Sequence, residues 1–215
     1  MSLLTEALQK IDYWFEHSQS SYASWHRNRQ DIWLRPGLER ELLELYSEEY
    51  NFRFSEEVYE LYQWHDGRIC IGDMANPVCF DPLDRVVDFI VREHIPCRAY
   101  MPLFIGDNAF FVVPEASVSN SASSPIFFFD GWIFPENSDP PWGCFRPEHY
   151  APSITCLMQA IAECAEKFDG ISAEYMEGDR QTIYPYFSQV RYRRSILSPI
   201  FDKYGVIGDC SGMWR

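Results

Sequence analysis

The sequence predicts an α+β fold in which helices flank a central, mostly antiparallel sheet. Helical periodicity occupies much of residues 3–91, and the period then changes to short strand-like runs between residues 103 and 130. A helical pattern returns from Ser153 onward. Helices before and after a group of strands are typical of an α+β domain. We expect residues 1–170 to form this domain, and residues 171–215 to form a C-terminal extension that packs on it.

The N-terminal segment is predicted to be an amphipathic helix. Its apolar residues recur at helical spacing: Leu4, Leu8, Ile11 and Phe15. The segment has neither a basic leader nor an uninterrupted apolar region, so we expect no signal peptide. No stretch of the sequence reaches the apolar length that a membrane-spanning helix needs.

Two tandem helices are predicted between Trp33 and Gly67. The apolar stripe of the first comprises Leu38, Leu42, Leu45 and Tyr46. Ser55 is a suitable N-cap for the second helix, with Glu56 and Glu57 in its positive first turn. The stripe of the second helix comprises Val58, Leu61 and Tyr62. Gly67 is expected to end this helix, because glycine adopts the left-handed conformation at little cost.

Two further helices are predicted on either side of the strands. Asp81 is expected to cap the first of them, which Pro82 opens and Pro96 prevents from continuing. The second is expected to begin at Ser153 and to stop near Gly170, with apolar residues along one face.

The strands are predicted from a change of period in the middle of the chain. Residues 103–105 and 109–113 flank a turn-forming segment at 106–108, which predicts a β-hairpin. Residues 126–129 form a bulky apolar run that is typical of a strand buried on both faces.

The charge of the chain narrows the class of partner. The 215 residues carry a formal net charge of −14. Nucleic acid is disfavoured as a partner, because phosphate binding depends on Lys and Arg. A basic protein partner is favoured, because complementary charge raises encounter rates and excludes wrong partners. The simpler alternative is that the negative charge serves only solubility.

The cysteines indicate a reducing compartment. They are odd in number and follow no regular framework: Cys70, Cys79, Cys97, Cys144, Cys156, Cys164 and Cys210. A secreted protein of this size would be expected to pair its cysteines. We therefore expect reduced thiols and a cytoplasmic protein.

The sequence contains no convincing motif for catalysis, a cofactor or a metal. Cys210 lies between glycines, but it lacks the following helix that a nucleophile elbow needs. His65 and Asp66 could serve as acid and base, although an Asp-Gly helix terminus is the preferred interpretation. The five histidines are scattered without metal-ligand spacing, which leaves open only a site assembled in space. We expect no enzymatic activity, no cofactor and no metal.

The order of motifs around the tandem helices can be compared with known families. The matching residues are Leu34, Pro36 and Gly37 before the first helix, Ser55, Glu56 and Glu57 at the second, and Leu61, Tyr62, Asp66 and Gly67 at its end. In this order they resemble the SUKH superfamily, which includes fungal regulators of cell-wall glucan synthesis and bacterial immunity proteins that neutralise toxins. Residues 101–113 and 124–130 resemble the central strands of that family.

The resemblance implies a non-enzymatic binding protein of the immunity type, which occupies the active surface of a basic toxin domain. Acidic side chains would then mimic the phosphates that a nuclease toxin expects. We expect the partner-binding residues to lie at the start of the second tandem helix and at loop tips: Glu56, Glu57, Glu60, Asp66, Asp73, Asp107 and Asn108.

Other functions stay open at this point. One is a regulatory adaptor with an endogenous partner in cell-wall synthesis or signalling. Another is a carbohydrate-binding or hydrolase domain, since Trp132, Trp142 and Tyr150 share one long loop and aromatic side chains can bind sugar. Residues 191–194 could stack on single-stranded nucleic acid, but pairing with the chain's own carboxylates is preferred.

Overall fold

The computed structural model describes residues 1–18, 35–67, 70–71, 78–92, 100–105, 109–114, 123–130, 148–176 and 198–207. The labelled helices in this part are α1 (Leu3–His17), α4 (Arg40–Tyr50), α5 (Glu56–Trp64), α6 (Leu83–Arg92) and α8 (Ile154–Met176), and residues 198–203 form a further short helix. The strands are β1 (Cys70–Ile71), β2 (Val78–Phe80), β3 (Tyr100–Ile105), β4 (Ala109–Pro114), β5 (Ile126–Asp130) and β6 (Glu148–Ala151). The mixed α+β composition is confirmed.

The strands of the described residues form one six-stranded sheet in the order β1-β2-β3-β4-β5-β6. Each neighbouring pair is antiparallel. The predicted hairpin is confirmed, because β3 pairs with β4 in a register that places Met101 opposite Val113. Chain neighbours are thus sheet neighbours throughout, with α6 inserted between β2 and β3.

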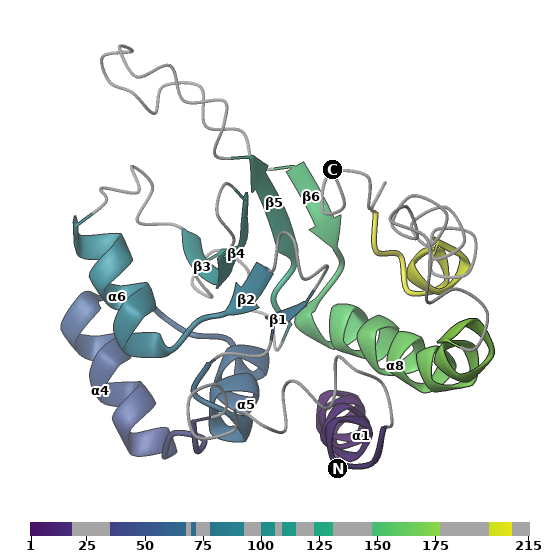
Figure 1. The fold of residues 1–215 in the computed structure, drawn as a ribbon. Coiled ribbons are helices and arrows are strands. Elements are labelled where there is room, and N and C mark those ends of the chain that lie inside the picture. Colours follow the sequence, from purple (N-terminus) through teal and green to yellow (C-terminus); the bar gives the residue numbers. More distant parts are fainter. Residues whose placement is uncertain are drawn as a thin grey trace.

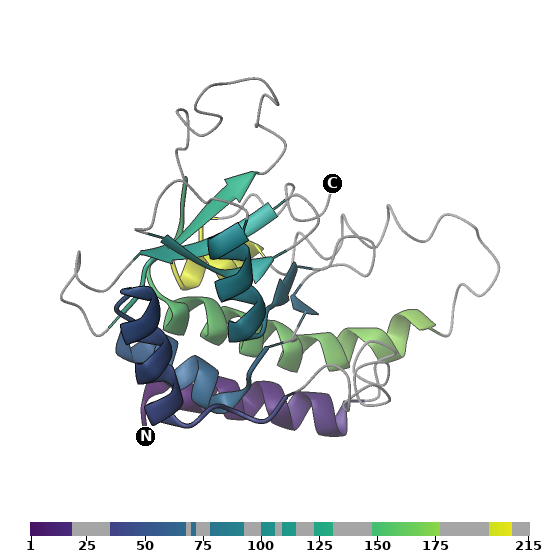
Figure 2. The same cartoon turned by 90° about the vertical axis from the view of Figure 1, so that its left-hand side faces the viewer.

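The helices cover the sheet unevenly. Figures 1 and 2 show α8 lying between the sheet and α1, while α4 and α6 lie at the opposite end of the molecule. The buried apolar residues of α1, α5, α6, α8 and the strands form one core cluster.

In β5 the expectation of burial on both faces is only partly met, since Ile126 is buried but Phe127 and Phe128 are half-buried. Phe127 packs edge-to-face against Tyr100 and His149.

The predicted apolar stripe of α4 is only partly right. Leu38 and Tyr46 are partly buried and pack against the core, as expected, but Leu42 and Leu45 do not. Leu43 is fully buried, whereas the exposed fractions of Leu42 and Leu45 are 41% and 61%. Arg40 supports this orientation: its guanidinium donates to Glu56 on α5 and lies 4.3 Å from the centre of the Tyr59 ring. Two leucines are therefore left on the outer side of α4.

The end of α5 also differs from the prediction. Ser55 caps the start as expected, accepting a hydrogen bond from the Val58 amide at 3.3 Å. The helix already ends at Trp64, and the following His65 is extended and bridges to Pro36. Gly67 does have a positive φ of 89°, but it lies beyond the helix, where a Cβ would be 2.2 Å from the Pro82 nitrogen.

The C-terminal helix and tail form part of the core. The helix expected to stop near Gly170 continues to Met176, so the expected boundary at 170 falls inside α8. In the tail, Ile200, Phe201 and Val206 are buried in the main core cluster. The amide of Ile207 also donates to the Tyr150 carbonyl of β6 at 2.6 Å, so the tail packs against β6 as well as α8.

Candidate partner-binding surface

The structure separates the predicted partner-binding residues into three groups. Asp73, Asp107 and Asn108 lie outside the described residues. Glu57 and Asp66 are buried, and Glu60 and Glu56 are at least partly exposed.

Glu57 is a structural anchor, which corrects the expectation that it lies on a solvated helix surface. Only 7% of this residue is exposed. Its Oε2 accepts hydrogen bonds from the amides of Ser124 at 2.6 Å and Ile154 at 3.2 Å. Its Oε1 accepts from the amide of Thr155 at 3.1 Å and from the Thr155 hydroxyl. The carboxylate therefore satisfies orphan donors at the positive N-terminus of α8 and ties α5 to the segment that precedes β5.

Asp66 is buried for a similar reason, and its expected role in partner binding is corrected in the same way. It is 7% exposed, and its Oδ1 accepts from the Leu83 amide at 2.8 Å. Asp66 therefore caps α6, a role that was expected for Asp81. The Oδ1 of Asp81 instead pairs with Arg85 at 3.1 Å. The other oxygen of Asp66 lies 3.4 Å from Arg35.

The remaining two acids of α5 have partners within the chain. Glu60 accepts hydrogen bonds from the hydroxyls of Ser2 and Thr5, which join the start of α1 to α5. Glu56 is exposed, but it is held by Arg40 at 2.8 and 2.9 Å. The hydrogen bond from Arg40 lowers the pKa of Glu56. Of the predicted residues that are described, Glu56 alone keeps an exposed carboxylate on the α4–α5 surface.

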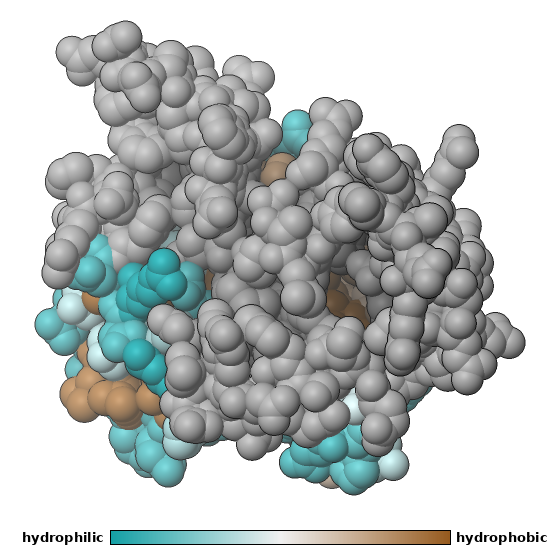
Figure 3. Space-filling view, in the orientation of Figure 1, coloured by the Kyte–Doolittle hydropathy of each residue, from teal (hydrophilic) through white to brown (hydrophobic). Residues whose placement is uncertain are grey.

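A larger exposed surface that the motifs did not reveal lies on α4. We call its outer side the α4 face, defined by Glu41, Leu42, Leu45, Glu48 and Glu49. All five residues are exposed. Figure 3 shows a hydrophobic patch bordered by hydrophilic residues at the lower left, where Figure 1 places α4. The signal in the sequence was the group of three leucines at 42, 43 and 45, of which a single helix face can bury only some.

The α4 face is strongly acidic. The sequences of α4 and α5 contain one cation, Arg40. Arg40 is already engaged by Glu44 at 3.1 Å and by Glu56, and these hydrogen bonds raise its pKa, with that to Glu56 contributing most. Among the described residues, no basic side chain forms an ion pair with Glu41, Glu48 or Glu49.

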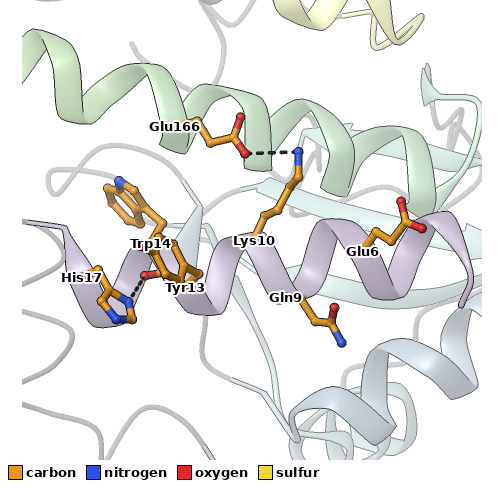
Figure 4. A pocket seen from close by; sticks show the side chains of 7 residues that line it. All are labelled: Glu6, Gln9, Lys10, Tyr13, Trp14, His17 and Glu166. Atoms are coloured by element: carbon orange, nitrogen blue, oxygen red, sulfur yellow. Dashed lines mark hydrogen bonds and ion pairs between the residues drawn. The ribbon is translucent and has the colours of Figure 1, made fainter.

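A pocket lies between α1 and α8, with a volume of about 510 Å³. Its lining residues are Glu6, Gln9, Lys10, Tyr13, Trp14, His17 and Glu166. Figure 4 shows Lys10 reaching from α1 to Glu166 on α8, a contact of 3.1 Å that neutralises both charges. Tyr13 stacks on His17 with ring centres 4.1 Å apart. The pocket could hold a small polar molecule against these rings.

His65 and Asp66, considered above as an acid and base, do not act on each other. His65 lies with Nε2 3.2 Å from Oδ1 of Asp12 and with Nδ1 3.1 Å from the Arg35 carbonyl. The second oxygen of Asp12 accepts from the Trp64 indole at 2.6 Å. This cluster joins α1 to the end of α5, a contact that the spacing of the residues gave no means of predicting.

The described residues contain no group of three or more side chains that could hold a metal ion. No helix in this part of the chain is long and apolar enough to cross a membrane. Cys156 and Cys164, both on α8, are not joined by a disulfide.

Comparison with known proteins adds no assignment. No protein-family model matches the sequence, and no curated protein matches it. The resemblance to the SUKH superfamily therefore stays a prediction from the motifs alone.

Proposed function

We propose that this protein is a non-enzymatic binding protein of the immunity type, which neutralises a basic toxin domain by occupying its active surface. The observation that carries the proposal is the excess of exposed carboxylates on α4 and at the start of α5. These are Glu41, Glu44, Glu48, Glu49 and Glu56. The one arginine among them, Arg40, is held by two of these carboxylates.

A surface of this kind suits a partner that normally binds phosphate. Carboxylates spread over two helices create a negative field that attracts a basic surface and raises the association rate. The net charge of −14 acts in the same direction over a longer range. The resemblance to SUKH proteins agrees with this function. The odd number of cysteines without a regular framework supports a cytoplasmic location.

The proposal is tested with a basic nuclease toxin domain, which is sought first among the products of the neighbouring genes. We expect its association rate to fall steeply as salt shortens the Debye length to about 10 Å and below. The triple substitution Glu41→Lys, Glu48→Lys and Glu49→Lys should slow association further and abolish protection of cells that express the toxin. A matched control reverses three exposed acids elsewhere: Glu16→Lys, Glu148→Lys and Asp202→Lys.

The control separates a local effect from the change in net charge, which is equal in the two triple variants. Equal slowing in both variants would mean that only the net charge matters. Unchanged association of the folded α4 variant would exclude this surface, and association that is insensitive to salt would refute the acidic mechanism.

A further inference from the structure

The apolar part of the α4 face defines the partner more closely than charge does. Leu42 and Leu45 are three positions apart, so their side chains are neighbours on one side of the helix. Both are exposed, whereas most helices of globular proteins place polar residues on the solvent side. Figure 3 shows a hydrophobic patch on the side of the molecule where Figure 1 places α4. Exposed apolar patches rimmed by polar residues mark interaction sites.

The exposure of these leucines is built into the fold. Rotating α4 to bury them would bring Leu43 out of the core, where it is fully buried. It would also break the two hydrogen bonds from Arg40 to Glu56 and remove Arg40 from the Tyr59 ring. Leu38, just before the helix, is fixed as well, because its amide donates to the Tyr62 carbonyl at 2.9 Å.

Carboxylates surround the apolar patch at helical spacing. Glu41 lies one turn before Leu45, and Glu48 and Glu49 lie one turn after it, so all three are neighbours of Leu45 on the helix surface. A partner that covers the leucines must therefore bring apolar side chains at its centre and cations at both ends. A second copy of this chain is disfavoured, because a twofold contact would place the same carboxylates against each other.

We propose that the α4 face is the docking site for a basic amphipathic helix of the partner protein. The apolar side of that helix packs on Leu42 and Leu45, and its Lys and Arg side chains pair with Glu41, Glu48 and Glu49. The eleven residues of α4 match a partner helix of about three turns, roughly 16 Å long. This inference rests on the proposed function, since it names the chemistry of the segment that the binding protein recognises.

The test uses a stapled, fluorescein-labelled helix of about 16 residues, long enough to be helical, with leucines on one side and lysines beside them. A second peptide has the same composition in scrambled order. We measure anisotropy at physiological salt and map the binding site from amide shifts of the full-length protein. We expect the amphipathic peptide to bind at least about tenfold more tightly than the scrambled one. The largest amide shifts should lie in α4.

Two pairs of substitutions make the test specific. Leu42→Ser with Leu45→Ser should weaken binding of the amphipathic peptide by about tenfold or more. The control pair, Leu3→Ser with Ile207→Ser, changes equally exposed apolar residues elsewhere and should alter binding less than about twofold. Thermal unfolding of both variants checks that the fold is retained.

Three outcomes would overturn the docking site. One is equal binding of the scrambled peptide with no effect of the leucine substitutions, which leaves only charge attraction. Another is no binding of either peptide. The third is concentration-dependent dimerisation that Leu42→Ser with Leu45→Ser abolishes, which would make a second copy the occupant. None of these decides the proposed function, which fails separately when a basic toxin domain associates equally well with the charge-reversed α4 variant.

Discussion

Replacement of Glu57 by alanine is expected to destabilise the protein far more than the same change at its neighbour Glu56. The Glu57 carboxylate accepts from three backbone amides and one hydroxyl, and alanine would leave these donors without that acceptor. A buried donor without an acceptor costs about 1–3 kcal/mol. Loss of a helix N-terminal acceptor alone costs about 0.5–2 kcal/mol. We therefore expect about 3–5 kcal/mol, a large part of the 5–15 kcal/mol typical of a domain.

The Glu56→Ala variant is the matched control. Glu56 is exposed and makes a surface ion pair with Arg40, which is worth up to about 1 kcal/mol. Glu57→Gln should fall between the two alanine variants. Glutamine has one acceptor oxygen, and its amide group would face two of the four donors that the carboxylate now satisfies.

Equilibrium unfolding in urea, followed by tryptophan fluorescence and by circular dichroism, measures the three variants. The order of unfolding free energies should be Glu56→Ala above Glu57→Gln above Glu57→Ala. If Glu57→Ala cost no more than Glu56→Ala, the buried network between α5, β5 and α8 would not be what holds these elements together. The assignment of Glu57 as an anchor would then fail.

Two further predictions concern the tail and a close backbone contact. Hydrogen bonds from Lys203, then Lys167 and Tyr204, lower the pKa of Glu163 from the usual 4.5 to about 2. This stabilisation is present above pH 4.5 and is lost as the pH falls towards 2, and we expect about 0.5–1 kcal/mol because the pair is partly exposed. The free energy of unfolding should therefore fall less between pH 4.5 and 2 in the Glu163→Gln variant than in the unsubstituted protein. An identical pH profile of the two proteins would contradict the stabilising ion pair. Gly37→Ala should prevent stable folding, because a Cβ there would lie 1.7 Å from the Gln63 carbonyl oxygen. Gly205→Ala is the control. It should cost only the strain of its φ of 66°, about 1 kcal/mol, because its Cβ would come no closer than 3.2 Å to Pro152. A soluble Gly37→Ala variant as stable as the unsubstituted protein would refute the close approach of Gly37 to Gln63.

Local patterns predicted those parts of the fold that depend on neighbouring residues. The N-terminal helix, the Ser55 cap and the β3–β4 pairing follow from spacing and capping chemistry alone, and the structure confirms them. The orientation of α4 could not be predicted from the sequence. Leucines occur at 42, 43 and 45, and one helix face can bury only some of them. The structure buries Leu43, and the ion pair between Arg40 and Glu56, sixteen residues apart, adds to this orientation.

The buried acids were mispredicted because their partners are remote in the sequence. Ile154 lies 97 positions beyond Glu57, so no local pattern shows that the N-terminus of α8 will meet this carboxylate. Leu83 lies 17 positions beyond Asp66, and the two meet where Gly67 and Pro82 are in close contact, which no local pattern shows. The extent of α8 beyond Gly170 was missed because a glycine inside a helix costs only about 1 kcal/mol relative to alanine and need not end the helix.

Burial in the fold therefore decides which acidic residues are available to a partner, and position in the sequence does not. Glu56 and Glu57 are adjacent, yet the 100° turn between successive helix positions puts one in solvent and the other in the interior. A carboxylate that already accepts several hydrogen bonds cannot neutralise a cation of a partner without breaking them. Under the proposed function, recognition by negative charge rests on carboxylates that stay exposed, and on the α4 face these are Glu41, Glu48 and Glu49. Because the same helix side exposes Leu42 and Leu45, the proposed docking site would use charge to guide the encounter and apolar contact to select among basic partners.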